Sequence, residues 1–186
     1  MCRGSRQKKI LRFLGLLALA WTCASASVQT ASARPMFLEH LSTLEGLPQG
    51  TVTATLQDSQ GFVWLGTEDG LVRFDGHDVR RYAYSRTAKA GLPGNFVYAI
   101  AEDAQGDLWI AVKGAGLAHW DRKTDRFSTY RHDPANPGSL SSDTVRTVLI
   151  DTRGRIWAGT LDAGVNIVDP RSGAIEHLRH DPARAD

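Results

Sequence analysis

Cysteine is nearly absent from this chain of 186 residues, and both copies lie near its start, at Cys2 and Cys23. The rest of the chain therefore has no disulfide, no zinc–thiolate site and no cysteine nucleophile. Long apolar runs are missing too. The run from Phe13 to Trp21 is shorter than the ~20 residues that a membrane-spanning helix needs, and no later run reaches that length. Packing without covalent cross-links must stabilise the fold.

A strongly basic composition is also missing. The chain has 22 Lys and Arg against 20 Asp and Glu, which gives a formal charge of +2. The first 33 positions hold five basic residues and no acid, so the rest of the chain is slightly acidic. Because nucleic-acid-binding proteins present a strongly basic face, we expect no nucleic-acid partner.

The N-terminal segment has the parts of an export signal. A positively charged stretch comes first, with Arg3, Arg6, Lys8 and Lys9. The apolar run follows, and small residues after it form two cleavage motifs, one ending at Ala26 and the other at Ala33. We expect residues 1–33 to be a signal peptide and the mature protein to be periplasmic. An uncleaved membrane anchor is the alternative.

One pattern occurs three times in the remainder, residues 34–186: Asp-x-x-Gly, then an apolar stretch around one Trp. Its tryptophans are Trp64, Trp109 and Trp157. They are 45 and 48 residues apart, and the similarity extends on both sides of the pattern. Such a period indicates a repeat architecture. The repeats fall at about 47–91, 92–139 and 140–186.

Asp-x-x-Gly is typical of a tight turn, because the carboxylate accepts backbone hydrogen bonds and Gly adopts positive φ without strain. The three turns are Asp58–Gly61, Asp103–Gly106 and Asp151–Gly154. The strand that follows each turn is apolar on both faces, and such a strand must be buried on both sides. We therefore expect the three tryptophans in a repeating core rather than stacked on a sugar.

Each repeat is expected to form four short strands. In the first repeat they fall at Val52–Leu56, around Trp64, at Leu71–Phe74 and at Val79–Tyr82. This unit is typical of a β-propeller blade, so we predict an all-β chain of three blades. Closed rings have ~4–8 blades, which favours an incomplete ring from a longer protein. Phe37–Leu41 is spaced like a fourth strand that would complete a last blade.

The repeat resembles that of the two-component regulator propeller family over residues 37–186. The likeness rests on a Leu-Pro start, the Asp-x-x-Gly turn, the Trp strand and a Gly-Leu or Gly-Val step. Val112 replaces a Thr, and Leu140-Ser141 replaces Leu-Pro. The resemblance implies the periplasmic sensor of a signalling protein, followed by a membrane helix and a histidine kinase or diguanylate cyclase. Neither output motif occurs in this chain.

The loops after the Trp strands differ in charge between repeats. Their charged residues are Glu68, Asp69, Lys113 and Asp162. Because the loops are equivalent, we expect these residues on one rim, where hairpin loops gather and bind ligands. Solvated turns are the alternative interpretation.

We expect no catalytic residue, cofactor or metal in this chain. Gly114-Ala115-Gly116 lacks the Lys-Ser/Thr of a phosphate loop. Each Asp-x-x-Gly supplies one carboxylate, where calcium needs several oxygen ligands. His132, His177 and His180 lie in strands or turns and not on a phosphoacceptor helix. No residue breaks the repeat as a grafted catalytic site would.

Two classes of function follow from these observations. The first is a periplasmic input domain that senses a small molecule or an oligosaccharide. The second is a secreted propeller enzyme or carbohydrate-binding module. A homodimer of the full-length protein is left open, and membrane contact is expected only through the signal segment or a downstream helix.

The export signal predicts that the mature protein lacks its N-terminal segment. Cell fractionation should place the chain in the periplasm, and N-terminal sequencing should begin after Ala26 or Ala33. Recovery of intact residues 1–26 on soluble cytoplasmic protein would contradict the prediction.

Overall fold

The structure is a computed structural model that describes residues 41–86 and 91–180. The expected signal peptide lies outside these residues, as does the expected strand at Phe37–Leu41 apart from Leu41 itself. Within the described ranges all regular structure is β-strand. No helix there is long and apolar enough to cross a membrane.

Three antiparallel four-stranded sheets follow one another along the chain. The first blade is β1 (Val52–Gln57), β2 (Val63–Thr67), β3 (Gly70–Phe74) and β4 (Val79–Tyr82). The second blade is β5 (Val97–Glu102), β6 (Leu108–Val112), β7 (Gly116–Asp121) and β8 (Arg126–Tyr130). The third blade is β9 (Val145–Ile150), β10 (Ile156–Thr160), β11 (Val165–Val168) and β12 (Ile175–Leu178).

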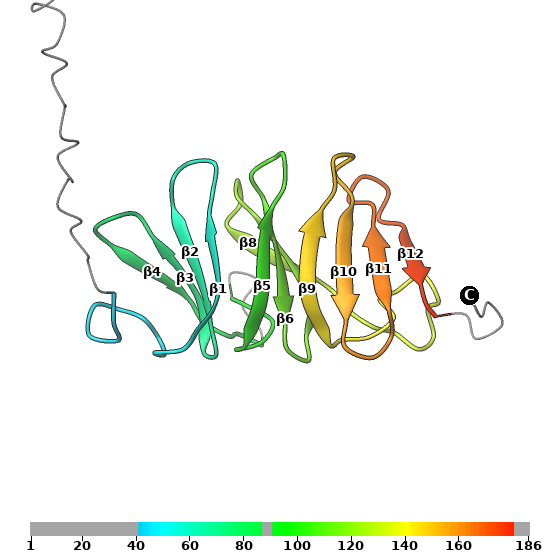
Figure 1. Ribbon diagram of the computed structural model, residues 1–186, viewed down its shortest axis with the longest axis horizontal. Helices are drawn as coiled ribbons and strands as arrows, with labels where there is room; N and C mark the ends of the chain where they lie inside the picture. Colours follow the sequence, from blue (N-terminus) through cyan, green and yellow to red (C-terminus); the bar gives the residue numbers. More distant parts are fainter. Residues whose placement is uncertain (1–40, 87–90, 181–186) are drawn as a thin grey trace, which may run out of the picture. The chain divides into compact units, whose positions relative to one another are not determined.

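The sheets stand side by side, with the first strands β1, β5 and β9 next to one another (Figure 1). This is the arrangement of propeller blades, whose first strands line the axis. The turns β1–β2, β5–β6 and β9–β10 lie along the upper edge in Figure 1, and the loops β2–β3, β6–β7 and β10–β11 lie along the lower edge. The predicted all-β propeller fold with three blades is confirmed, as an open set of sheets.

Close approach of neighbouring blades near the axis requires small residues. Gly66 of β2 pairs with Ala54 of β1 and faces Val97, the first residue of the next blade. A Cβ atom added at Gly66 would lie 2.6 Å from Val97 Cγ1, closer than real side chains come. This Gly of the Trp strand thus permits the inner edges of the first two blades to meet.

Two apolar layers fill the spaces between blades. In the first, Trp64 lies against Tyr82 of its own blade and Trp120 of the second blade, with ring centroids 5.6 and 4.7 Å apart. In the second, Trp109 packs toward Ile156 and Val168 of the third blade. The middle blade is therefore covered on both faces, and every residue of its β6 strand is buried.

Trp157 is less buried than its two counterparts. Trp64 and Trp109 are 0% and 1% exposed, whereas Trp157 is half-buried and Leu149, its partner in β9, is 61% exposed. Among the described residues no further sheet covers this face of the third blade. The corresponding burial expected from the repeat therefore applies only to the first two tryptophans.

Replacing each tryptophan by alanine should show this difference in burial as a difference in the stability that is lost. Trp64→Ala and Trp109→Ala each leave a large cavity and should lower the free energy of unfolding by about 3–5 kcal/mol. Trp157→Ala should cost clearly less, because part of its ring already contacts water. Urea unfolding monitored by circular dichroism measures the difference, with Leu44→Ala as the exposed control. Equal losses at all three tryptophans would contradict the assignment of the blade interfaces.

Candidate ligand site between the second and third blades

Each Asp-x-x-Gly turn is joined to the Trp of its own repeat. Asp58 Oδ1 accepts hydrogen bonds from the backbone N–H groups two and four residues further on, at 3.0 and 2.9 Å. Asp58 Oδ2 accepts one from Trp64 Nε1 at 2.9 Å. Asp103 and Asp151 make the same three bonds in their repeats. The Gly that ends each turn has positive φ, 92° at Gly61, which side chains rarely tolerate.

Arg122 fills the space between the first and second blades at this end. From the β7–β8 turn its Nη2 donates to Asp58 Oδ2 at 2.8 Å and to Glu102 Oε1 at 3.2 Å. Its Nε donates to the carbonyl of Gly106 at 2.6 Å, and the guanidinium lies over the Trp120 ring. The guanidinium thus bridges two blades and neutralises a fully buried carboxylate.

The hydrogen bonds decide the charge state of Asp58. Burial by itself favours the neutral acid, but donors from Trp64, Arg122 and the backbone outweigh it, so the pKa of Asp58 lies below its ordinary value. In the third repeat the Trp157 bond is the largest cause of a pKa of Asp151 well below the usual range, and Arg155 contributes to it. Both carboxylates therefore stay ionised at neutral pH.

Pro170 stands in the third blade where the second blade has Arg122. The β7–β8 and β11–β12 turns share their backbone geometry, since in each the fifth residue donates its N–H to the first residue's carbonyl at 2.8 Å. Glu102, which also binds the guanidinium, has Ile150 as its counterpart in the third blade. The charged bridge of the first interface therefore has no equivalent in the second.

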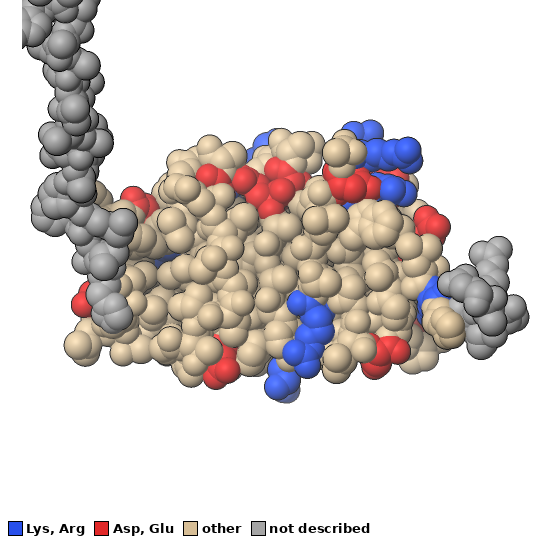
Figure 2. All heavy atoms as spheres, viewed as in Figure 1, with Lys and Arg blue, Asp and Glu red and all other residues tan. Residues whose placement is uncertain are grey.

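A cavity of about 370 Å³ opens where this bridge is missing. One wall comes from the second blade, with Asp103, Asp107, Trp109 and His119. The other comes from the third blade, with Arg153, Gly154, Pro170 and Arg171. In the space-filling view acidic and basic atoms lie near each other along this upper edge (Figure 2). The cavity is thus lined by charges of both signs.

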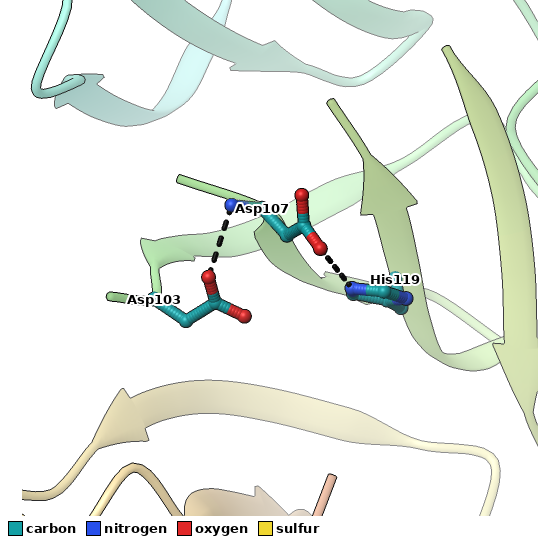
Figure 3. A group of neighbouring side chains, drawn as sticks. All are labelled: Asp103, Asp107 and His119. Carbon is teal, nitrogen blue, oxygen red and sulfur yellow. Dashed lines mark hydrogen bonds and ion pairs between the residues drawn. The ribbon is translucent and has the colours of Figure 1, made fainter. Parts of the chain in front are cut away.

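Asp107 and His119 form a polar pair (Figure 3), and the His119 ring packs against the Trp109 ring. His119 Nε2 lies 3.2 Å from Asp107 Oδ2, and the His119 and Trp109 ring centroids are 4.5 Å apart. Tyr130 packs on the same indole at 5.5 Å. In the first blade Arg73 takes the corresponding place. These contacts cover the indole face, so a sugar ring cannot stack on it.

Asp103, Asp107 and His119 are close enough to share a metal ion, with donor atoms within 4.8 Å of one another. Their atoms, however, already have partners. Asp103 Oδ1 accepts two backbone bonds, Asp107 Oδ1 accepts the N–H of Arg122, and Asp107 Oδ2 faces His119. Asp103 also has the same role as the aspartates of the other repeats. The donor set therefore fits a hydrogen-bond network better than a metal centre.

The charged residues expected on one rim lie at the opposite end of the blades, in the loops β2–β3, β6–β7 and β10–β11. All are exposed, and three of them contact neighbouring loops. Glu68 accepts from Gln49, Asp69 accepts from Asn95 at 3.0 Å, and the Lys113 ammonium lies 5.4 Å from the centre of the Phe96 ring. The fourth, Asp162, lies in the β10–β11 loop. Their role as a ligand rim remains a prediction.

Three stretches of the chain, residues 46–69, 91–114 and 139–162, match the two component regulator propeller family. The chain contains three repeats of that family. The expectation from the Asp-x-x-Gly and Trp pattern is thereby confirmed. A 39-residue stretch of this regulator propeller is 46% identical to histidine kinase P4 of Formosa agariphila, and covers 21% of this chain and 3% of that protein.

Solved structures show the same fold. The extracellular domain of a putative hybrid two component system of B. thetaiotaomicron is 29% identical, with a TM-score of 0.71 over 76% of this chain. Virginiamycin B lyase of Staphylococcus aureus is 16% identical, with a TM-score of 0.53 over 74% of this chain, and shares the fold alone. The regulator propeller spans 20% of the first of these chains and 44% of the second.

Two features of this regulator propeller were not predicted from the sequence. The first is the direct bond between the turn Asp and the Trp six residues later, which were assigned separately to a turn and to the core. The second is that Pro170 of the third blade stands where the second blade has Arg122. Aligning the turns after β7 and β11 would have exposed the exchange.

Removing the Arg122 side chain should destabilise the regulator propeller. Arg122→Ala leaves the Asp58 carboxylate buried without its cation, so we expect a loss of about 3 kcal/mol in unfolding free energy at pH 7. The lowered pKa of Asp58 stabilises the fold above its unfolded pKa, and that stability is lost as the pH falls through the folded value. On acidification below pH ~4, the unfolding free energy of Arg122→Ala should therefore fall less than that of the parent.

Urea titrations at pH 7 and pH 3 measure both effects. Lys123→Ala, an exposed neighbour, serves as the control and should match the parent. A parent-like Arg122→Ala at pH 7 would show that the bridge between the blades does not stabilise the fold.

Proposed function

We propose that this chain is the exported, ligand-sensing input part of a bacterial signal-transduction protein. Its output, a histidine kinase or diguanylate cyclase, would lie outside the 186 residues. The observation that carries the proposal is the likeness to the extracellular domain of a hybrid two component system, at 29% identity and a TM-score of 0.71. The three family repeats and the basic, then apolar N-terminal segment support it.

The chemistry of the described residues also favours input over catalysis. Their polar cluster, Asp103, Asp107 and His119, is internally hydrogen-bonded, and Asp103 binds its Trp as the turn aspartates of the other two repeats do. It contains no nucleophile positioned by a base. A cavity lined by charged groups and backed by rigid strands is suited to binding a small ligand.

A secreted propeller enzyme is the second candidate. Virginiamycin B lyase, an enzyme by its name, shares the blade arrangement. Because that likeness is one of fold, it says nothing about which residues would catalyse a reaction here. The input function is therefore preferred, with a small molecule or an oligosaccharide as its signal.

The proposal predicts that the reading frame continues past Asp186. Sequencing the DNA downstream should reveal further repeats, a membrane helix and then a kinase or cyclase. In the source bacterium, deletion of residues 41–180 from the full-length protein should make transcription of its target genes insensitive to changes in the medium, because the sensing surface is gone.

A full-length protein with the exposed substitution Lys123→Ala is the matched control and should respond as the parent does. A stop codon that directly follows a closed ring of blades would instead support the secreted enzyme or binding module. An unchanged response after the deletion would contradict an input role for these residues.

A further inference from the structure

The carboxylate oxygen Oδ2 of the turn aspartate, which binds the Trp indole, also accepts a hydrogen bond from an arginine guanidinium in two of the three repeats. Asp58 Oδ2 accepts from Trp64 Nε1 and from Arg122, at 2.9 and 2.8 Å. Asp151 Oδ2 likewise accepts from its Trp at 3.0 Å and from Arg155 Nε at 2.8 Å.

Asp103 differs from both. Its Oδ2 accepts from Trp109 Nε1 at 2.9 Å, and no cation of the described chain pairs with it. Asp103 is also only half-buried, whereas Asp58 is 5% exposed. The middle repeat thus presents, at the cavity, an acceptor that its neighbours use for a guanidinium.

The place that the Arg122 guanidinium occupies in the first interface, here called the guanidinium slot, has a second acceptor. The second interface retains this acceptor. In the first interface the Gly106 carbonyl accepts from Arg122 Nε. Its counterpart, Gly154, lines the cavity of the second interface. Pro170, in Arg122's place, has a short apolar ring without an N–H, so it leaves the slot open and offers no donor.

The third-blade wall adds two cationic side chains. Arg153 and Arg171 line the cavity and are exposed, and neither guanidinium forms an ion pair within residues 41–86 and 91–180. Arginine forks are suited to bidentate binding of a carboxylate. A ligand that bridges the two walls would therefore carry a cation at one end and an anion at the other.

We propose that the cavity between the second and third blades binds a small zwitterion of the arginine type, with a guanidinium on Asp103 and the Gly154 carbonyl and a carboxylate on Arg153 and Arg171. The ligand supplies the group that Arg122 supplies in the first interface. The bound ligand bridges the second and third blades and holds them in fixed contact. This is a structural change that a sensor can transmit. This assignment rests on the proposed input function for its purpose, but its binding chemistry can be tested alone.

The size of the cavity agrees with this class of ligand. Its volume of about 370 Å³ is at the small end of the ~300–1,000 Å³ of small-molecule sites. The covered face of Trp109 disfavours a stacked sugar, and the two walls of opposite charge disfavour a purely anionic or purely cationic ligand.

Calorimetry on the full chain with three probes separates the two ends of the ligand. L-arginine carries both charges, citrulline replaces the guanidinium with a neutral urea, and agmatine lacks the carboxylate. We expect arginine to bind about tenfold or more tightly than either of the others, because each loses one charge-assisted contact. Citrulline binding as tightly as arginine would overturn the assignment of Asp103.

The decisive variant places an arginine side chain of the protein itself in the guanidinium slot. Pro170→Arg rebuilds the side chain found at position 122, and it should both abolish arginine binding and raise the melting temperature. Pro170→Ala removes the ring without filling the slot and should bind arginine as the parent does. Undiminished arginine binding by Pro170→Arg would place the ligand elsewhere and overturn the proposal.

Arg153→Ala combined with Arg171→Ala tests the carboxylate end on two exposed side chains. Arginine affinity should fall to that of agmatine, while agmatine affinity should not fall. A similar loss for both probes would contradict the proposed orientation. In the full-length protein, arginine binding without any change of output would contradict the input function alone, and a normal response without arginine binding would contradict this site alone.

Discussion

The hydrogen bond from the Trp indole to the turn aspartate is the interaction on which each blade depends. It joins the start of the second strand to the turn before it, so the position of the largest core side chain is fixed by a carboxylate at the edge of the sheet. The same carboxylate closes the turn through two backbone N–H groups. Because one carboxylate both closes the turn and positions the Trp, neither the turn nor the core can change without the other. These hydrogen bonds also offset the desolvation free energy of a buried acid.

Differences between the blades arise outside this common element. The partner of the carboxylate oxygen that binds the indole varies between repeats. In the first repeat it is Arg122 of the second blade, and in the third it is Arg155, which directly precedes β10 of the same blade. In the middle repeat this oxygen belongs to Asp103, which lines the cavity between the second and third blades. A repeat fold can thus keep its blades nearly identical and still create one distinctive site, by exchanging a residue at the contact between blades.

The fold was largely predictable from the sequence because its causes are local. In the first repeat Val79–Tyr82 forms a strand with the predicted bounds, and the strands expected at Val52–Leu56 and Leu71–Phe74 are each one residue longer, since apolar alternation and Gly-containing turns define them. The half-buried state of Trp157 was harder to predict, because burial depends on the sheet that packs against it. The cavity was missed because Asp103 and Pro170 belong to different repeats. Reading each repeat alone does not show which residue of the next blade its aspartate meets.

The contact between Gly66 and Val97 has a consequence for the whole ring. A propeller closes when the angles between successive blades add up to a full turn, and each angle depends on how closely the blades approach at the axis compared with the periphery. At this position Gly brings the inner edges together, whereas a larger side chain would act as a spacer between them. The middle blade has Ala111 there, and the third has Gly159. The number of blades in a closed ring is thereby linked to the size of the residue two positions after each tryptophan.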